Sequence, residues 1–419
     1  MLNKITKLKD NLQWKLLFIL STGYMGAFIN IQGIQALMPF IQDDFGISRT
    51  EAGLYSTFLF LSATVVAIFS GNIVDKIGSK KTLLFGIFSI GFLMLAHTVS
   101  PIYSIILILA FITGIGFSII TPAVNKSIMD EVTPENRGIS MGIMHSGSGI
   151  GGFAGAALLP ILAGTLGWRG AILISSLLTI ILGFYVKKAY NPDKSLANNN
   201  DNPDSNFKDN ILSLLKNKQL MLACSLGLIF GLAVGSIPAH YTLFLTTDLG
   251  YSSALAGFAL GIVQIGGIIG RTLWGWISDS IFNGNRTISF ILIMFIIVLL
   301  NLSYGLFGEF LASSRLIILT ISFMLGLTAF GWSGLYFTVV GERVRPDQTG
   351  IASGLSLIFL RTGVVVGPPL FGLLADHYDH YHNSWLVLAG LVFVSGAIYY
   401  YLQNKEDKKN SRPYTGPNV

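Results

Sequence analysis

Long apolar stretches, each about the length of a membrane-crossing helix, follow one another along almost the whole chain. A helix rises about 1.5 Å per residue, so about 20 apolar residues cross the hydrocarbon core of a bilayer. The pattern predicts twelve such helices, at residues 15–39, 52–75, 81–99, 102–124, 138–163, 168–187, 219–245, 253–278, 287–308, 315–340, 350–374 and 383–402. The chain is therefore expected to be an all-α membrane protein.

Composition and charge agree with this interpretation. The chain is 52% hydrophobic and only 11% charged, with a mean hydropathy of +0.64. An even number of crossings returns both termini to one side of the membrane. If that side is the cytoplasm, the outer segments contain only Arg49, Arg169 and Arg315 among the Lys and Arg residues, as the positive-inside rule requires. We expect a multi-pass protein of the cell membrane with both termini cytoplasmic, and the net charge of +6 then reflects topology and not a nucleic-acid partner.

A polar segment in the middle of the chain divides the helices six and six. At an offset of 204 residues, Ser48 falls on Ser252, Gly71 on Gly275 and Asp75 on Asp279; at an offset of 212, "VTPENRGISMG" overlays "VRPDQTGIASG". Matches in the same order indicate a duplicated bundle with a pseudo-two-fold axis along the membrane normal and a cleft between its halves. The predicted parts are an N-terminal six-helix bundle at 1–187, a cytoplasmic linker at 188–218, a C-terminal six-helix bundle at 219–402 and a cytoplasmic tail at 403–419.

Two arginines lie inside predicted helices, whereas no acidic residue occupies the middle third of any helix. A charge within the membrane is costly unless it is compensated, so it tends to mark function. Arg271 lies two turns from Asp279, which leaves snorkelling toward the interface as an alternative, and Arg361 is about eleven residues from either helix end. The pair predicts a positive site for a mobile anion.

Other polar and aromatic side chains accompany the arginines. Gln264 shares a helix face with Arg271, and Trp332 shares one with Tyr336. The first helix contains Asn30, Gln32 and Gln35, which point several ways, so at most two can face one cavity. The predicted substrate-binding residues are Arg271, Arg361, Trp332, Tyr336, Asn30, Gln35 and Gln264.

Histidines are candidates for proton coupling because they titrate near neutral pH. His145 is the better candidate because it lies about two turns inside its helix, and His240 is the weaker one. The alternative for both is a hydrogen-bonded histidine that serves helix packing.

The segment "GNIVDKIGSKK" resembles the loop signature of the major facilitator superfamily. Its matching positions are Gly71, Asp75, Lys76, Gly78 and Lys81, and the second half repeats it in part at Gly275 and Asp279. Gly71 is expected to allow close helix approach, and Asp75 to pair with loop cations and stabilise one conformation.

Arg271, Arg361 and the Trp332–Tyr336 pair resemble the oxalate/formate antiporter branch and, more loosely, the monocarboxylate transporters. The resemblance implies that the two cations hold a small carboxylate and that the aromatic pair walls the pocket. That branch uses lysine where this chain has Arg361. Its pocket is lined by tyrosines in helices 4 and 5, where this chain has only Tyr103 at the edge of helix 4, and both differences argue against oxalate as the substrate.

Together these features predict a secondary active transporter that moves a mono- or dicarboxylate by alternating access, as an exchanger or a proton symporter. The protein is not expected to be an enzyme. The alternatives are a nitrate-like porter and a drug or metabolite exporter. Nitrate porters use an arginine in helix 2 as well as one in helix 8, whereas here the offset of 204 maps Arg271 onto Ala67, which argues against nitrate. The expected partners are the small anion, the lipid bilayer and a coupling proton or counter-anion, and the protein is expected to act as a monomer. No cofactor or metal is expected, because "GSGIGG" lies within a helix and "DHYDHYHN" lacks rigid ligand spacing.

Overall fold

The computed structural model describes residues 13–191, 213–345 and 348–410, and within these ranges the chain is helical without strands. Most of the predicted linker and the last part of the predicted tail lie outside the described residues. The helices are α2 Trp14–Ala36, α3 Met38–Phe45, α4 Arg49–Ile77, α5 Ser79–Thr98, α6 Tyr103–Glu131, α7 Pro134–Ala189, α9 Lys218–Thr247, α10 Ser253–Ser280, α11 Arg286–Leu306, α12 Gly308–Ala312, α13 Arg315–Ala329, α14 Ser333–Glu342, α15 Thr349–Tyr378 and α16 His382–Asn410.

Eleven helices in the described ranges are long and apolar enough to cross a membrane. One of them, Ile139–Ala189, contains two of the predicted crossings. These two follow one another directly, and the helix is interrupted at Gly167, whose φ of 68° is a conformation that glycine adopts without steric cost. The all-α architecture with twelve crossings is therefore confirmed.

Two predicted crossings are divided into shorter helices. The first becomes α2 and α3, with Pro39 in the first turn of α3, where its missing N–H is not needed. The tenth becomes α13 and α14, and the break between them includes Gly331. An added Cβ at Gly331 would lie 2.6 Å from the Cα of Gly270, so this helix is interrupted at a close approach to α10.

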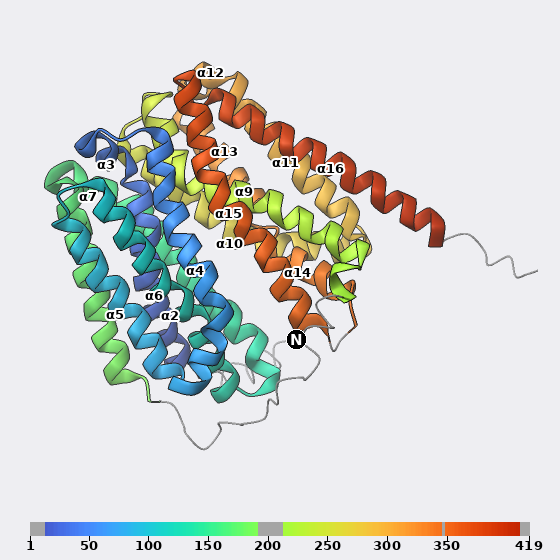
Figure 1. Cartoon of the computed structure of the whole chain (residues 1–419), viewed down its shortest axis with the longest axis horizontal. Coiled ribbons are helices and arrows are strands. Elements are labelled where there is room, and N and C mark those ends of the chain that lie inside the picture. Colours follow the sequence, from blue (N-terminus) through green and yellow to red (C-terminus); the bar gives the residue numbers. More distant parts are fainter. Residues whose placement is uncertain (1–12, 192–212, 346–347, 411–419) are drawn as a thin grey trace, which may run out of the picture.

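The internal repeat predicted from the sequence is visible in the packing. In the first half α2 packs on α7, α4 on α6 and α5 on α7; in the second half α9 packs on α15, α10 on α13 and α11 on α16. Ser48 and Ser252, matched by the repeat, both cap helices, since their hydroxyls accept from Glu51 N and Leu255 N. Figure 1 shows the two halves side by side, blue to green and yellow-green to red.

The two halves contact each other along two lines, α4 against α15 and α7 against α10. Glycines allow this approach: an added Cβ at Gly53 would lie 2.6 Å from the Pro368 carbonyl oxygen, and one at Gly257 would lie 2.4 Å from that of Ala156. Thr57 also donates to the Val365 carbonyl across the interface at 2.7 Å. We call the end of the molecule that contains these contacts, α3 and α12 the closed end (Figure 1).

The same four helices are separated at the opposite end, which contains Asp75 and Asp279 and which we call the open end. An added Cβ at Gly71, Gly142, Gly275 or Gly354 meets no atom within 4 Å. These glycines lie one each on α4, α7, α10 and α15. The expected close approach at Gly71 is therefore absent from this conformation, in which the halves meet at one end only.

Candidate substrate site

Arg271 lies on α10 with its side chain exposed, and it faces the first half of the protein. Its charge acts on Tyr24 of α2 and on His145 of α7. No acidic side chain in the described ranges forms an ion pair with it, although Arg169 has one such partner and Arg286 has two. The guanidinium thus presents an uncompensated positive charge between the two halves.

Close packing of α7 against α2 and α10 shapes the surroundings of Arg271. The rings of Tyr24 and His145 meet edge to face at 5.6 Å. Further along α7, an added Cβ at Gly149 would lie 2.0 Å from the Ile268 side chain. The small residues that could pass for a dinucleotide motif therefore bring these helices together, as their spacing predicts.

One turn beyond Gly149, two glutamines from different halves converge on Gly152. An added Cβ there would lie 3.3 Å from Cγ of Gln32 and 3.5 Å from Cγ of Gln264. The Gln32 Oε1 and Gln264 Nε2 atoms are buried and have no hydrogen-bond partner. Gln264 therefore lies in the interface with Arg271, as predicted, and Gln32 joins it.

Arg361 occupies a different part of the interface. Its Nη1 donates to the Ala63 carbonyl oxygen of α4 at 3.0 Å, so the guanidinium bridges the two halves. Arg271 belongs to the α7 and α10 contact, whereas Arg361 belongs to the α4 and α15 contact. The structure thus places both predicted arginines between the halves, on separate contact lines.

The aromatic pair lies inside the second half. Trp332 is 2% exposed and Tyr336 is fully buried. Trp332 stacks on Phe230 with ring centroids 4.5 Å apart and donates its indole N–H to the Ala329 carbonyl at 2.7 Å. Tyr336 donates to the Ser356 carbonyl at 3.3 Å. In this conformation the pair is part of the bundle core, and the pocket-wall role that the resemblance implies stays a prediction.

Asn30 likewise points away from the interface. Its Nδ2 donates to Thr179 Oγ1 at 2.7 Å, and its Oδ1 accepts from Ser175 Oγ at 2.9 Å, all within the first half. Asn30 and Gln32 are two residues apart on a helix, so they face in nearly opposite directions. The structure therefore gives the Asn30 amide a packing function in this conformation, and its place in the substrate site stays a prediction.

Gln35 lies nearer the closed end. It is buried, its Nε2 approaches Ser56 Oγ at 3.4 Å, and its backbone oxygen accepts from Thr242 of the second half at 3.2 Å. Its Oε1 has no partner. The structure does not place Gln35 beside Arg271.

The two histidines have different surroundings. His145 is partly exposed next to Arg271 and Tyr24. His240 is fully buried and bonds to the Pro368 carbonyl at 2.8 Å and to the Tyr381 hydroxyl at 3.1 Å. His240 thus serves packing at the closed end, whereas His145 adjoins the candidate site.

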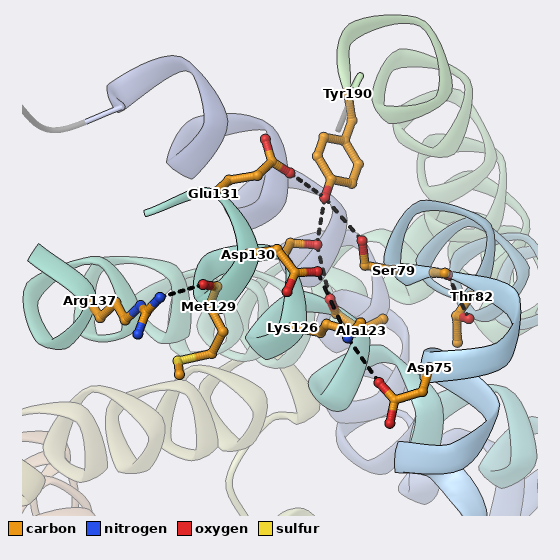
Figure 2. A network of polar contacts seen from close by, with 12 residues as sticks. Asp75, Ser79, Thr82, Ala123, Lys126, Met129, Asp130, Glu131, Arg137 and Tyr190 are labelled. Carbon is orange, nitrogen blue, oxygen red and sulfur yellow. Dashed lines mark hydrogen bonds and ion pairs between the residues drawn. The ribbon is translucent and has the colours of Figure 1, made fainter. Parts of the chain in front are cut away.

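The loop signature lies at the open end (Figure 2). Asp75 pairs with Lys126 of α6 at 2.9 Å, and Lys126 lies 3.9 Å from Asp130. The predicted partner was a loop cation; the actual partner is on a helix, because α4 and α6 pack along their length. Gly78, with a φ of 91°, forms the turn between α4 and α5 that this position of the signature requires.

The second half repeats this arrangement with a different cation. Arg286 contacts Asp279 and pairs with Glu342 at 3.2 Å. The two repeat offsets map Asp75 on Asp279 and Asp130 on Glu342, so they could have identified both acid pairs. The cations, Lys126 and Arg286, come from non-equivalent positions and leave no such signal.

A tyrosine ties the first half together at the same end. Figure 2 shows Tyr190, just after α7, with its hydroxyl between Glu131 and Ser79. The same hydroxyl also lies 2.7 Å from Ser127 Oγ. Burial raises the pKa of Tyr190 above its usual value, so the hydroxyl stays protonated and donates to Glu131 at 2.7 Å.

The predicted site residues left out a stripe of polar and aromatic side chains along α2, which includes Tyr24. Ser21, Tyr24, Phe28 and Gln32 are spaced by three or four residues, which places them on one helix face. Ser21 Oγ, like Gln32 Oε1, is buried without a partner. This periodicity was the available signal, and it separates Gln32 from Asn30.

Proteins related to this chain are transporters. A hexuronate transporter of Bacillus subtilis (strain 168) is 22% identical over 397 residues, which cover 91% of this chain and 93% of that protein. Monocarboxylate transporter 13 of Rattus norvegicus is 26% identical over 328 residues, 77% of this chain and 72% of its own. The quinolone resistance protein NorA of Staphylococcus aureus (strain MRSA252) is 25% identical over 400 residues, 91% of this chain and 96% of its own.

A solved structure with the same fold is a bacterial homologue of the human lysosomal transporter Spinster in an inward-facing and unoccupied conformation. It superposes with a TM-score of 0.78 at 14% identity and covers 95% of this chain and 98% of its own. The sequence also matches the family profile described as Major Facilitator Superfamily over residues 20–362. This match spans most of both halves, and the chain therefore belongs to the major facilitator superfamily.

Proposed function

We propose that this protein carries a small organic anion, a mono- or dicarboxylate, across the cytoplasmic membrane by alternating access. The observation that carries the proposal is the uncompensated charge of Arg271 between the halves. A guanidinium cannot lose its proton in a protein, and its planar fork matches a carboxylate. A mobile carboxylate would supply the missing negative charge.

The positions of other basic residues support an orientation in the membrane. Arg49, Arg169 and Arg315, the residues predicted to lie outside, all belong to segments at the closed end, whereas Lys126 and Arg286 lie at the open end. By the positive-inside rule the open end faces the cytoplasm. The described conformation is then inward-open, with Arg271 accessible from the cytoplasm.

The charge also favours exchange. Closing an empty cleft around Arg271 desolvates an unpaired cation, whereas a bound anion neutralises it and lowers that cost. His145, beside Arg271, is the residue best placed to carry a proton if transport is instead proton-coupled.

The names of the relatives support a carboxylate as the substrate and also indicate the main alternative. Two of the three are transporters whose names specify carboxylates, hexuronate and monocarboxylate. NorA is a quinolone resistance protein, which keeps drug export as the second candidate. Export of a cationic drug would require acidic groups in the cleft, and Arg271 has none paired with it in the described ranges.

The test is counterflow into proteoliposomes of purified protein, with radiolabelled lactate, glucuronate, succinate, nitrate and tetraphenylphosphonium as probes. We expect uptake of at least one carboxylate, and its loss in Arg271→Gln by at least about 30-fold, since removing one partner of a desolvated charge pair costs ~2–5 kcal/mol. Arg315→Gln, the same change at an exposed position of the closed end, is the control and should transport normally. Uptake of the phosphonium cation alone, or full carboxylate uptake by Arg271→Gln, would contradict the proposal.

A further inference from the structure

Two glutamine side chains that flank Gly152 in the interface have buried polar atoms that no group in the described protein satisfies. Gln32 comes from α2 in the first half and Gln264 from α10 in the second, and both flank Gly152 of α7. The unpaired atoms are Gln32 Oε1 and Gln264 Nε2. A buried amide without a partner destabilises the protein unless a ligand or water completes it.

The two atoms are complementary, since one is an acceptor and the other a donor. A hydroxyl group can satisfy both at once, because it donates through its hydrogen and accepts through its oxygen. A carboxylate is an acceptor only and would leave Gln32 Oε1 unpaired. Rotating both amides exchanges their roles and leaves the pair with one donor and one acceptor. The chemistry of this pair therefore fits an O–H group, which a substrate hydroxyl can supply in place of water and a carboxylate cannot.

The position of the two glutamines relative to Arg271 indicates the length of the ligand. Gln264 and Arg271 are seven residues apart, about 10 Å along the axis of α10 at 1.5 Å per residue. Both side chains lie in the same contact between α10 and the first half, with Gly149 and Ile268 between them. A carboxylate at Arg271 can thus be followed by several carbons before a hydroxyl reaches the glutamines.

We infer that Gln32 and Gln264 recognise hydroxyl groups and that the substrate is a polyhydroxylated carboxylate of about sugar-acid length. This inference rests on the proposed function, because it takes Arg271 as the carboxylate site. Since the two glutamines belong to different halves, a hydroxyl that bonds to both would also connect the two halves through the substrate.

The experiment compares ligands that differ only in hydroxyl groups. Gluconate, 6-hydroxyhexanoate and hexanoate share a six-carbon chain and one carboxylate, and each competes with counterflow of the best carboxylate found above. We expect gluconate to inhibit at least 10-fold more strongly than hexanoate, with 6-hydroxyhexanoate between them. In Gln32→Met and Gln264→Met the ratio of the two inhibition constants should fall to 3-fold or less.

The matched control is Gln42→Met, the same change in α3 at the closed end, where Gln42 donates only to the Ile47 carbonyl. It should keep the wild-type ratio. Thermal unfolding and size-exclusion profiles of each variant separate a lost preference from a lost fold.

The outcomes distinguish the two proposals. If hexanoate competes as well as gluconate against a transported carboxylate, the hydroxyl inference is wrong and the proposed function stands. The inference is also wrong if both glutamine variants, properly folded, keep the wild-type ratio. If no carboxylate is transported, the proposed function fails and the inference fails with it.

Discussion

A carboxylate from the second half caps a helix of the first half at the closed end, and this contact predicts how the conformational equilibrium can be shifted. Asp376, near the end of α15, accepts from the backbone N–H groups of Arg49 at 2.9 Å and Thr50 at 2.8 Å. It also accepts from the Thr50 hydroxyl at 2.5 Å. The first N–H groups of a helix have no partner within it, so this carboxylate satisfies part of the α4 N-terminus from across the interface. Opening the closed end breaks these hydrogen bonds.

The size of the effect follows from the contacts. A capping side chain contributes ~0.5–2 kcal/mol, and a hydrogen bond to a charged group ~1.5–3 kcal/mol. Asp376 is only partly buried, so solvent screening reduces the sum. We expect Asp376→Ala to destabilise the closed end by about 2–3 kcal/mol, which shifts the ratio of the two conformations about 30- to 140-fold toward opening there.

The assay is a distance distribution between spin labels at Asp43 and Ser313, which are exposed at the closed end in different halves. Cys224 is the single cysteine and is buried, so replacing it by serine leaves a clean background. Asp376→Ala should enlarge the population at long distance. The control is Glu51→Ala, because Glu51 accepts from Ser48 N at 2.8 Å within α4 and its loss affects both conformations equally. An unchanged distribution in Asp376→Ala, or an equal shift in Glu51→Ala, would refute the reasoning.

Three further predictions concern stability. Asn30→Ala removes hydrogen bonds inside the first half and should lower stability by about 2 kcal/mol in thermal unfolding, with substrate affinity retained; a large loss of affinity in a stable variant would instead place Asn30 in the site. Trp332→Ala leaves a cavity beside Phe230 and should lower the free energy of unfolding by ~3–5 kcal/mol; unchanged unfolding with impaired transport would instead indicate that the aromatic pair forms the pocket wall. Lys126→Ala breaks the partly exposed pair with Asp75 and should change stability by less than about 1 kcal/mol, so a larger loss in calorimetry would contradict the surface character of that pair.

Several features of the interface were readable from the sequence because they depend on residue type and local spacing. Arg271 and Arg361 stand out in apolar helices wherever their side chains point. The glycines at 147, 151 and 155 recur every four residues, so they lie on one face in any helix, and in the structure they pack on the backbone of α2. These properties survive any rearrangement of the helices around each other.

The directions of the other side chains were not readable. Successive residues on a helix are about 100° apart, so Asn30 and Gln32 face nearly opposite sides of α2. Trp332 and Tyr336 share a face, as predicted, yet the break at Gly331 and the stacking on Phe230 direct that face into the bundle. Which face of a helix meets the cleft depends on its neighbours, and those neighbours are remote in sequence.

The sequence by itself determined that the chain crosses a membrane twelve times in two repeated halves, because bilayer thickness and chemistry leave an apolar segment few alternatives. It also determined that unpaired cations lie within the membrane. Only the packing of the helices decided which end is closed, that Arg361 contacts Ala63 while Arg271 pairs with no acidic side chain of the described ranges, and that Gln32 and Gln264 flank the same glycine. These contacts join residues far apart in the chain, and they depend on how whole helices pack, which the local spacing of residue types does not specify.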